Sequence, residues 1–143
     1  MKKIILLVDD DSAMVDLLET LFLQNGWLPQ RATSGEDALA SVALAVPQAV
    51  ICDLNMPGIS GFDVAASLRQ SCGAQCPALI AFTACPDRDV SLHAMNAGFD
   101  AVVAKPVEFD RLLSAVLGSL KVNRARHRKS VADVHALAAS GIA

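Results

Sequence analysis

Long hydrophobic runs are missing from this 143-residue sequence, although its mean hydropathy of +0.42 is high for a water-soluble chain. The apolar segment Ile4 to Val8 follows two lysines, as in a signal peptide, but it stops after five residues at three aspartates. A membrane-spanning helix needs about 20 apolar residues, and the core of a signal peptide needs about 7 to 15. We therefore expect no membrane segment and a cytoplasmic protein.

Paired metal-ligand spacings are also missing. The chain has four cysteines, and only Cys72 and Cys76 lie close together, without a second pair or a nearby histidine. That pattern is weak evidence for a metal site. In a reducing compartment we expect the cysteines to remain thiols. The three histidines have no nucleophile or ligand partner in the sequence and are expected at the surface: His93, His127 and His135.

Aromatic residues are scarce, with one Trp, five Phe and no Tyr, and neither internal repeats nor low-complexity tracts occur. Ala, Val and Leu dominate instead, which suits strands buried on both faces beneath Ala-rich helices. A chain of this length predicts one domain with a core of its own.

Charge is divided unevenly along the chain. The net charge is −3, but residues 119–143 carry +4, which leaves −7 on the rest. The basic segment has no aromatic residues, and the acidic remainder would repel phosphates. Nucleic acid is therefore an unlikely partner.

Short apolar segments alternate with helical segments five times. Each apolar segment is bounded by turn signals, as expected for strands buried in a parallel sheet. Alternation of this kind predicts an α/β fold with helices on both faces of a doubly wound parallel sheet. The expected strands are residues 4–8, 28–33, 49–52, 78–82 and 101–104, and the expected helices lie near residues 12–24, 34–44, 62–70, 87–97 and 109–120.

The first helix shows how its ends and its buried face are predicted. Ser12 is expected to cap its start, Asp11 to be exposed, and Asn25-Gly26 to end it. Helical spacing predicts an inward stripe of Met14, Leu17, Leu18, Leu21 and Phe22.

Four of the five predicted strands end in reactive side chains. Asp9 and Asp10 follow the first strand, Asp53 the third, Thr83 the fourth and Lys105 the fifth. The carboxyl ends of parallel strands share one edge of a sheet, so these residues should converge at an exposed edge. Three neighbouring carboxylates repel one another, and Mg²⁺ would relieve this repulsion while keeping sites for water and phosphate. A lysine and a hydroxyl beside them suit the transfer of a phosphoryl group.

With these strand-end residues, the sequence resembles the receiver domain of two-component response regulators over roughly residues 3–120. Any one of the shared motifs is weak evidence, but all five occur in order at predicted strand ends or turns. They are Val8-Asp9-Asp10, Asp53-Leu54-Asn55-Met56-Pro57-Gly58, Phe82-Thr83-Ala84, Ala97-Gly98-Phe99-Asp100 and Lys105-Pro106.

The resemblance implies a role for each strand-end residue in handling phosphate. Asp53 would be the phosphoacceptor. Thr83 and the N–H of Ala84 would bond phosphoryl oxygens, and Lys105 would neutralise one of them. The Lys105–Pro106 bond would be cis.

The resemblance also implies a Mg²⁺ site. Asp10 would bind the ion directly, Asp9 mainly through water, and Asp53 with a carboxylate oxygen. Asn55 would contribute its backbone carbonyl.

The implied fold is flavodoxin-like, with five parallel strands in the order 2-1-3-4-5 and five helices. The implied function is a phosphorylation-dependent switch, supplied by a histidine kinase or a histidine phosphotransfer protein and read by an unknown downstream protein. Such a protein catalyses only its own phosphorylation and dephosphorylation.

Two positions depart from the family pattern. Val102 stands where many members carry an aromatic residue whose rotation reports phosphorylation, so an aromatic switch is not expected. Cys85 occupies a position that tunes dephosphorylation in the family.

A small Mg²⁺-dependent phosphohydrolase of the haloacid dehalogenase type is the alternative, because it also uses an Asp nucleophile at a strand end. Members of that family carry an Asp-x-Asp pattern, whereas this chain has Asn55 in place of the second aspartate. The receiver interpretation is therefore preferred.

The resemblance ends near residue 120, which divides the chain into a receiver domain at 1–120 and a basic tail or helical extension at 121–143. The tail has two interpretations. It extends the fifth helix, or it forms a short amphipathic helix near Ser130 that docks on a partner or on a second copy in a homodimer. The second interpretation rests on a narrow apolar stripe of Val131, Val134, Leu137 and Ala138.

Overall fold

The computed structural model describes residues 3–106 and 108–139, with side chains described as far as residue 126. Five parallel strands form one sheet in the order β2-β1-β3-β4-β5. They are β1 (Ile4–Val8), β2 (Leu28–Ala32), β3 (Ala49–Cys52), β4 (Ala78–Thr83) and β5 (Ala101–Ala104). The flavodoxin-like topology predicted from the sequence is confirmed.

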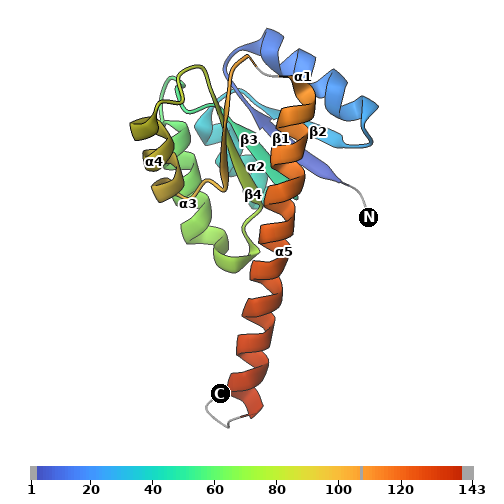
Figure 1. The fold of residues 1–143 in the computed structure, drawn as a ribbon, viewed down its shortest axis with the longest axis vertical. Coiled ribbons are helices and arrows are strands. Elements are labelled where there is room, and N and C mark those ends of the chain that lie inside the picture. The colour runs from blue at the N-terminus through green and yellow to red at the C-terminus, as the bar shows by residue number, and fades with distance from the viewer. Residues whose placement is uncertain (1–2, 107, 140–143) are drawn as a thin grey trace.

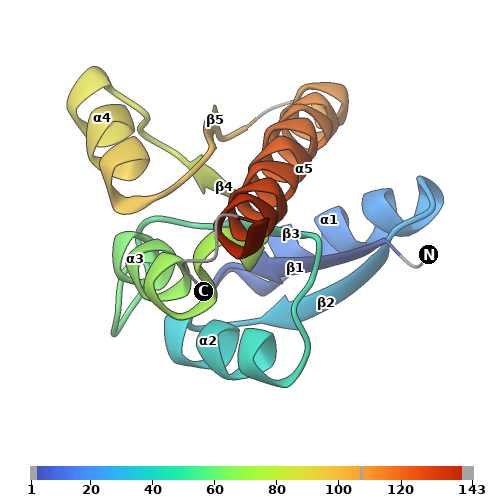
Figure 2. The same cartoon turned by 90° about the horizontal axis from the view of Figure 1, so that it is seen from below.

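Five α-helices cover the sheet, and a short 3₁₀ turn at Gly73–Gln75 precedes β4. Buried side chains place α1 and α5 on one face of the sheet and α2, α3 and α4 on the other (Figures 1 and 2). Over the ranges described, none of the helices combines the length and the apolar character needed to cross a bilayer. The helices are α1 (Ser12–Gln24), α2 (Gly35–Leu44), α3 (Gly61–Cys72), α4 (Arg88–Ala97) and α5 (Phe109–Ala139).

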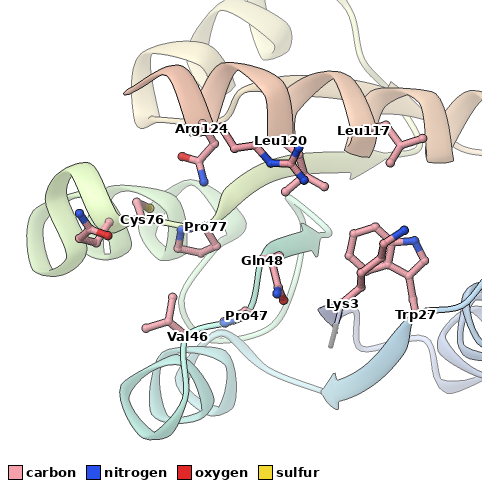
Figure 3. Close-up of a pocket in the computed structure, with 12 residues that line it drawn as sticks. Lys3, Trp27, Val46, Pro47, Gln48, Cys76, Pro77, Leu117, Leu120 and Arg124 are labelled. Atoms are coloured by element: carbon pink, nitrogen blue, oxygen red, sulfur yellow. The ribbon is translucent and has the colours of Figure 1, made fainter. Parts of the chain in front are cut away.

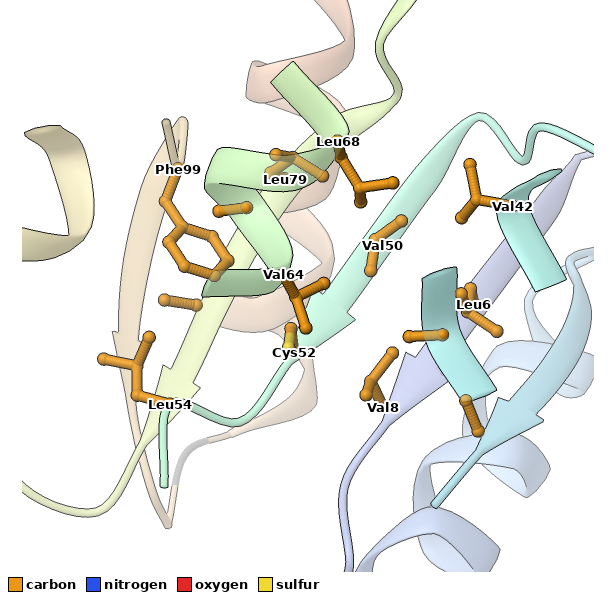
Figure 4. Close-up of a cluster of buried hydrophobic side chains, with 14 of the residues drawn as sticks. Leu6, Val8, Val42, Val50, Cys52, Leu54, Val64, Leu68, Leu79 and Phe99 are labelled. Carbon is orange, nitrogen blue, oxygen red and sulfur yellow. The ribbon is translucent and has the colours of Figure 1, made fainter. Parts of the chain in front are cut away.

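Side chains alternate between the two faces of the sheet along each central strand, because successive residues of a strand point to opposite sides. Leu6 and Val8 of β1 pack with Val50 of β3 beneath α2, α3 and α4 (Figure 4). Ile5 and Leu7 pack on the opposite face, beneath α1 and α5. Both faces of the central strands are therefore buried, which accounts for their uninterrupted apolar sequence.

The start and the buried face of α1 differ from the sequence-based expectation. Asp11, not Ser12, caps the helix, and its carboxylate accepts hydrogen bonds from the N–H groups of Ala13 and Met14. Val15 is fully buried, whereas Leu17 is 54% exposed. Helical periodicity predicts that a buried stripe exists, but packing against the sheet decides the rotation of the helix about its axis.

The last helix continues past residue 120 without a break, and its C-terminal half extends beyond the body of the protein (Figure 1). Asn123 is only 6% exposed, and the Arg126 guanidinium contacts Asp100, so both residues pack on the body. The boundary proposed at residue 120 and the docking of the tail on a partner remain predictions. The apolar stripe expected between Val131 and Ala138 lies outside the described side chains.

The contact at Asp100 ties α5 to two other elements. Its Oδ1 lies 2.7 Å from Arg126 Nη2 and 3.0 Å from Arg69 Nη2 of α3, and its Oδ2 accepts a hydrogen bond from Leu79 N–H of β4. Arg69 also donates to the carbonyl of Gly98, at the end of α4. The Asp100 carboxylate, 11% exposed, therefore joins α3, α5 and β4 at the amino edge of the sheet.

Replacement of Asp100 with Ala should lower the free energy of unfolding by about 3 kcal/mol, because Arg69 would be left partly buried without its charge partner. Arg126→Ala should cost about 1 kcal/mol, since Asp100 keeps its contact with Arg69 and the Arg126 side chain is partly exposed. Urea denaturation measures both changes. Arg124→Ala is the control on the same helix, and a loss as large as that of Asp100→Ala in this control would contradict the assignment.

Candidate functional site

The parallel register brings four strand ends to one edge of the sheet. Val8 pairs with Cys52, so Asp9 and Asp53 leave β1 and β3 at the same level, and Asp53 N–H donates to the Val8 carbonyl at 2.9 Å. At the other side of the edge, Lys105 N–H donates to the Thr83 carbonyl at 2.8 Å. Residues almost a hundred positions apart therefore meet because of strand order.

Three carboxylates converge at this edge. Each of Asp9, Asp10 and Asp53 offers one oxygen, and these oxygens all lie within 4.8 Å of one another. Asp9 and Asp53 are buried, at 3% and 8% exposure, while Asp10 is exposed. The cluster therefore combines two shielded carboxylates with one that reaches solvent.

Lys105 supplies the positive charge of the site. Its Nζ lies 2.6 Å from Asp9 Oδ2 and 3.5 Å from Asp53 Oδ2, and it also sits over the ring of Phe82 at 5.4 Å. Burial lowers the pKa of the ammonium, but the hydrogen bond to Asp9 and the charges of both carboxylates outweigh it and raise the pKa overall. Lys105 therefore stays charged and holds the two buried carboxylates together.

The pKa of Asp53 is raised, chiefly because burial disfavours its charged form and also because Asp9 repels it. The N–H of Asn55, which donates to Asp53 Oδ1 at 3.3 Å, and the charge of Lys105 both act in the opposite direction. Burial therefore outweighs the stabilisation that Asn55 and Lys105 give to the charged form of Asp53.

Thr83 differs from the expectation of an exposed edge. It is 1% exposed, and its Oγ1 is buried without a hydrogen-bond partner among the described residues. Ala84 and Cys85, which follow it, are exposed. Thr83 is the end of β4 itself, so the sheet and its covering helices shield the hydroxyl, and the expected exposure is wrong.

Asn55 lies in the loop after β3 with its side chain exposed, and its backbone is tied to Asp53. The Lys105–Pro106 peptide bond is cis, as the resemblance implies. Val102 is half-buried in β5 and packs on the core beneath α4, in place of an aromatic ring.

Gly61 lies beside the site, although none of the sequence motifs includes it. It begins α3, and a Cβ at this position would collide with the carbonyl oxygen of Asp53 and lie 2.8 Å from the Cα of Leu54. Ser60 and Asp63 close the start of the helix with a capping box. The helix can therefore pack directly on the backbone that carries Asp53, and the capping-box spacing was the available sequence signal.

The donor set suits a hard divalent cation. Carboxylate oxygens are the ligands that Mg²⁺ prefers, and the ion keeps several waters or phosphate oxygens. Three carboxylates against one lysine leave an excess of negative charge, which a divalent cation would offset. The carboxylates present therefore fit a Mg²⁺ ion.

Similarity of the whole sequence to known proteins agrees with this site. A family model described as the response regulator receiver domain matches residues 5–117. The chain is 30% identical over 122 residues to the transcriptional regulatory protein KdpE of Mycobacterium tuberculosis, which covers 85% of this chain and 53% of that protein. The chain thus spans about half the length of that relative.

Solved structures show the same fold. A putative response regulator from Chloroflexus aurantiacus is 31% identical, with a TM-score of 0.79 over 85% of this chain and 99% of that one. The response regulator TrrA of Thermotoga maritima, solved in complex with Mg²⁺ and beryllium fluoride, is 33% identical, with a TM-score of 0.74 over 83% and 99% of the two chains. Taken with the strand order and the family match over residues 5–117, these likenesses show that the chain belongs to the response regulator receiver domain family.

Proposed function

We propose that this receiver domain is a phosphorylation-dependent switch that accepts a phosphoryl group on Asp53 in the presence of Mg²⁺. The observation that carries the proposal is the meeting of Asp9, Asp10 and Asp53 within 4.8 Å, with Lys105 bridging Asp9 and Asp53. A receiver domain is a signalling domain and not an enzyme with an external substrate. Its chemistry is confined to its own phosphoryl group.

Each residue has a defined part in the transfer. A carboxylate oxygen of Asp53 attacks the phosphorus of a phosphohistidine, the N–P bond breaks, and an acyl phosphate forms on Asp53. Asp10, Asp53 and the Asn55 carbonyl would hold Mg²⁺ directly and Asp9 mainly through water, and the ion would supply positive charge for the phosphoryl oxygens.

The remaining groups then hold the transferred phosphoryl group. Lys105 is released from Asp53 to neutralise one phosphoryl oxygen, because its ion pair at 3.5 Å is the longer of its two contacts. Thr83 Oγ1 has no partner among the described residues, so it is free to donate to a second oxygen, beside the N–H of Ala84. The hydroxyl would then change from an unpaired to a bonded group upon phosphorylation.

The proposal names the class of phosphoryl donor but not the pathway. The donor is a histidine kinase or a histidine phosphotransfer protein, and the reader of the signal is a downstream protein. We place the reaction in the cytoplasm, where the four free cysteines would stay reduced.

With Mg²⁺ and acetyl phosphate, the protein should gain one acid-stable, base-labile phosphoryl group on Asp53. Asp53→Asn keeps the shape of the side chain but removes the nucleophile, so labelling should fall to background, and EDTA should have the same effect on the unaltered protein. Mass spectrometry of the intact protein measures the added phosphoryl group. Equal labelling of Asp53→Asn would refute the assignment of the phosphoacceptor.

Thr83→Ala should still accept the phosphoryl group but lose the phosphorylation-dependent change in the rest of the protein, because the hydroxyl that bonds the phosphoryl oxygen is gone. Amide hydrogen exchange with and without beryllium fluoride measures that change. Cys85→Ala, two residues further along the chain, is the control, and it should respond as the unaltered protein does. An unchanged response in Thr83→Ala would remove Thr83 from the switch.

In EDTA at pH 7, Asp53→Asn should raise the melting temperature by about 3 °C, equivalent to about 1 kcal/mol for a chain of this size. The folded-state pKa of Asp53 is raised, so ionisation of this carboxyl destabilises the fold as the pH rises above its unfolded-state pKa. At pH 3 the carboxyl is protonated in both states, and the difference should vanish. Asp10→Asn, at an exposed carboxylate, should change the melting temperature less, and an equal effect would contradict burial as the cause.

A further inference from the structure

A cavity of about 580 Å³ lies at the amino edge of the sheet, away from the carboxylate cluster. Its walls include Leu120 of α5 and three residues that directly precede strands. Trp27 precedes β2, Gln48 precedes β3 and Pro77 precedes β4. Strands of four to six residues separate this edge from the carboxyl edge by roughly 15 Å. None of the residues assigned to the phosphoryl site lines the cavity.

The cavity has the size and the mostly apolar walls of a small-molecule site, for which about 300 to 1,000 Å³ is usual. Leu117 and Leu120 extend from α5 toward the side where Trp27 and Pro77 lie (Figure 3). Leu117 lines the cavity and is 43% exposed, so an apolar side chain of α5 is open to it.

Basic residues alone supply the charge around this cavity. Lys3 and Arg124 line it, and no aspartate or glutamate does. Lys3 Nζ lies 5.7 Å from the centre of the Trp27 ring, so a cation and an aromatic surface are already held together. Arg124 is exposed and forms no ion pair within the described part of the chain. Charge complementarity therefore selects an anion.

Asn123 adds a polar group that lacks a partner. The residue lines the cavity and is 6% exposed, and its Oδ1 is buried with no donor among the described residues. A buried carbonyl oxygen without a hydrogen bond is uncommon and costly. The residue therefore adds a polar amide to the wall of the cavity.

We propose that this cavity binds a small amphipathic anion. Its apolar or aromatic body lies against Trp27 and Leu120, and its carboxylate, sulfonate or phosphate lies at the mouth beside Lys3 and Arg124. A cation is disfavoured by the two basic residues, and an uncharged apolar molecule leaves both of them unused.

The test uses 6-anilinonaphthalene-2-sulfonate, which combines an aromatic body, an anion and one N–H donor. Trp27 is the only tryptophan of the chain, so energy transfer from its emission to the bound probe reports binding to the protein, and the variants below locate the site. We expect saturable binding of one probe per chain. N-phenyl-2-naphthylamine lacks only the sulfonate and should bind at least about tenfold more weakly.

Variants locate the anion. Lys3→Gln combined with Arg124→Gln should weaken binding of the sulfonate probe about tenfold, while Lys121→Gln, on the same helix but outside the cavity, should change it by less than about twofold. Leu117→Asp places a negative charge on an already exposed wall and should abolish binding. Each variant should unfold at the same temperature as the unaltered protein within about 2 °C, which a surface substitution allows.

The proposal is overturned if the sulfonate and the uncharged probe bind equally well. It is also overturned if Lys121→Gln weakens binding as much as the double variant does. Absence of saturable energy transfer from Trp27 has the same meaning. These outcomes do not depend on Asp53, whose labelling by acetyl phosphate is measured separately in every variant.

Discussion

Repulsion among three carboxylates at one edge of a parallel sheet is the constraint on which the site depends. The register of β1 against β3 places Asp9 and Asp53 side by side. Close packing of α3 at Gly61 fixes the backbone of Asp53 and Leu54. Lys105 balances part of this charge through its contacts at 2.6 and 3.5 Å. The remaining imbalance is what makes the edge suitable for a divalent cation and a phosphoryl group.

The two edges of the sheet are built differently. At the carboxyl edge charge is concentrated, and a buried hydroxyl of Thr83 has no partner among the described residues. Toward the amino edge, Asp100 is shared by Arg69 and Arg126, which anchors α5 to the body. The Asp100 contact of α5 and the cavity near Trp27 therefore involve no residue of the phosphoryl site.

Local patterns and tertiary packing were predictable to different degrees. Strand ends, the cap of α2 at Ser34 and the end of α4 at Gly98 follow from short sequence signals, and the structure has them. The rotation of α1 was not predictable, because Val15 and Leu17 are equally apolar and only the shape of the sheet beneath decides which is buried. The cap at Asp11 was missed for a similar reason, since Asp11 and Ser12 are both good capping residues one position apart.

Apolar runs that end in Asp9, Asp53, Thr83 and Lys105 were enough to determine the fold class and the edge at which the site forms, because parallel strands must place their carboxyl ends together. Distances and hydrogen-bond partners are properties of packing, and sequence spacing does not specify them. Only the tertiary structure therefore decided that Thr83 is buried, that Lys105 pairs more closely with Asp9 than with Asp53, and that a cavity remains beneath α5.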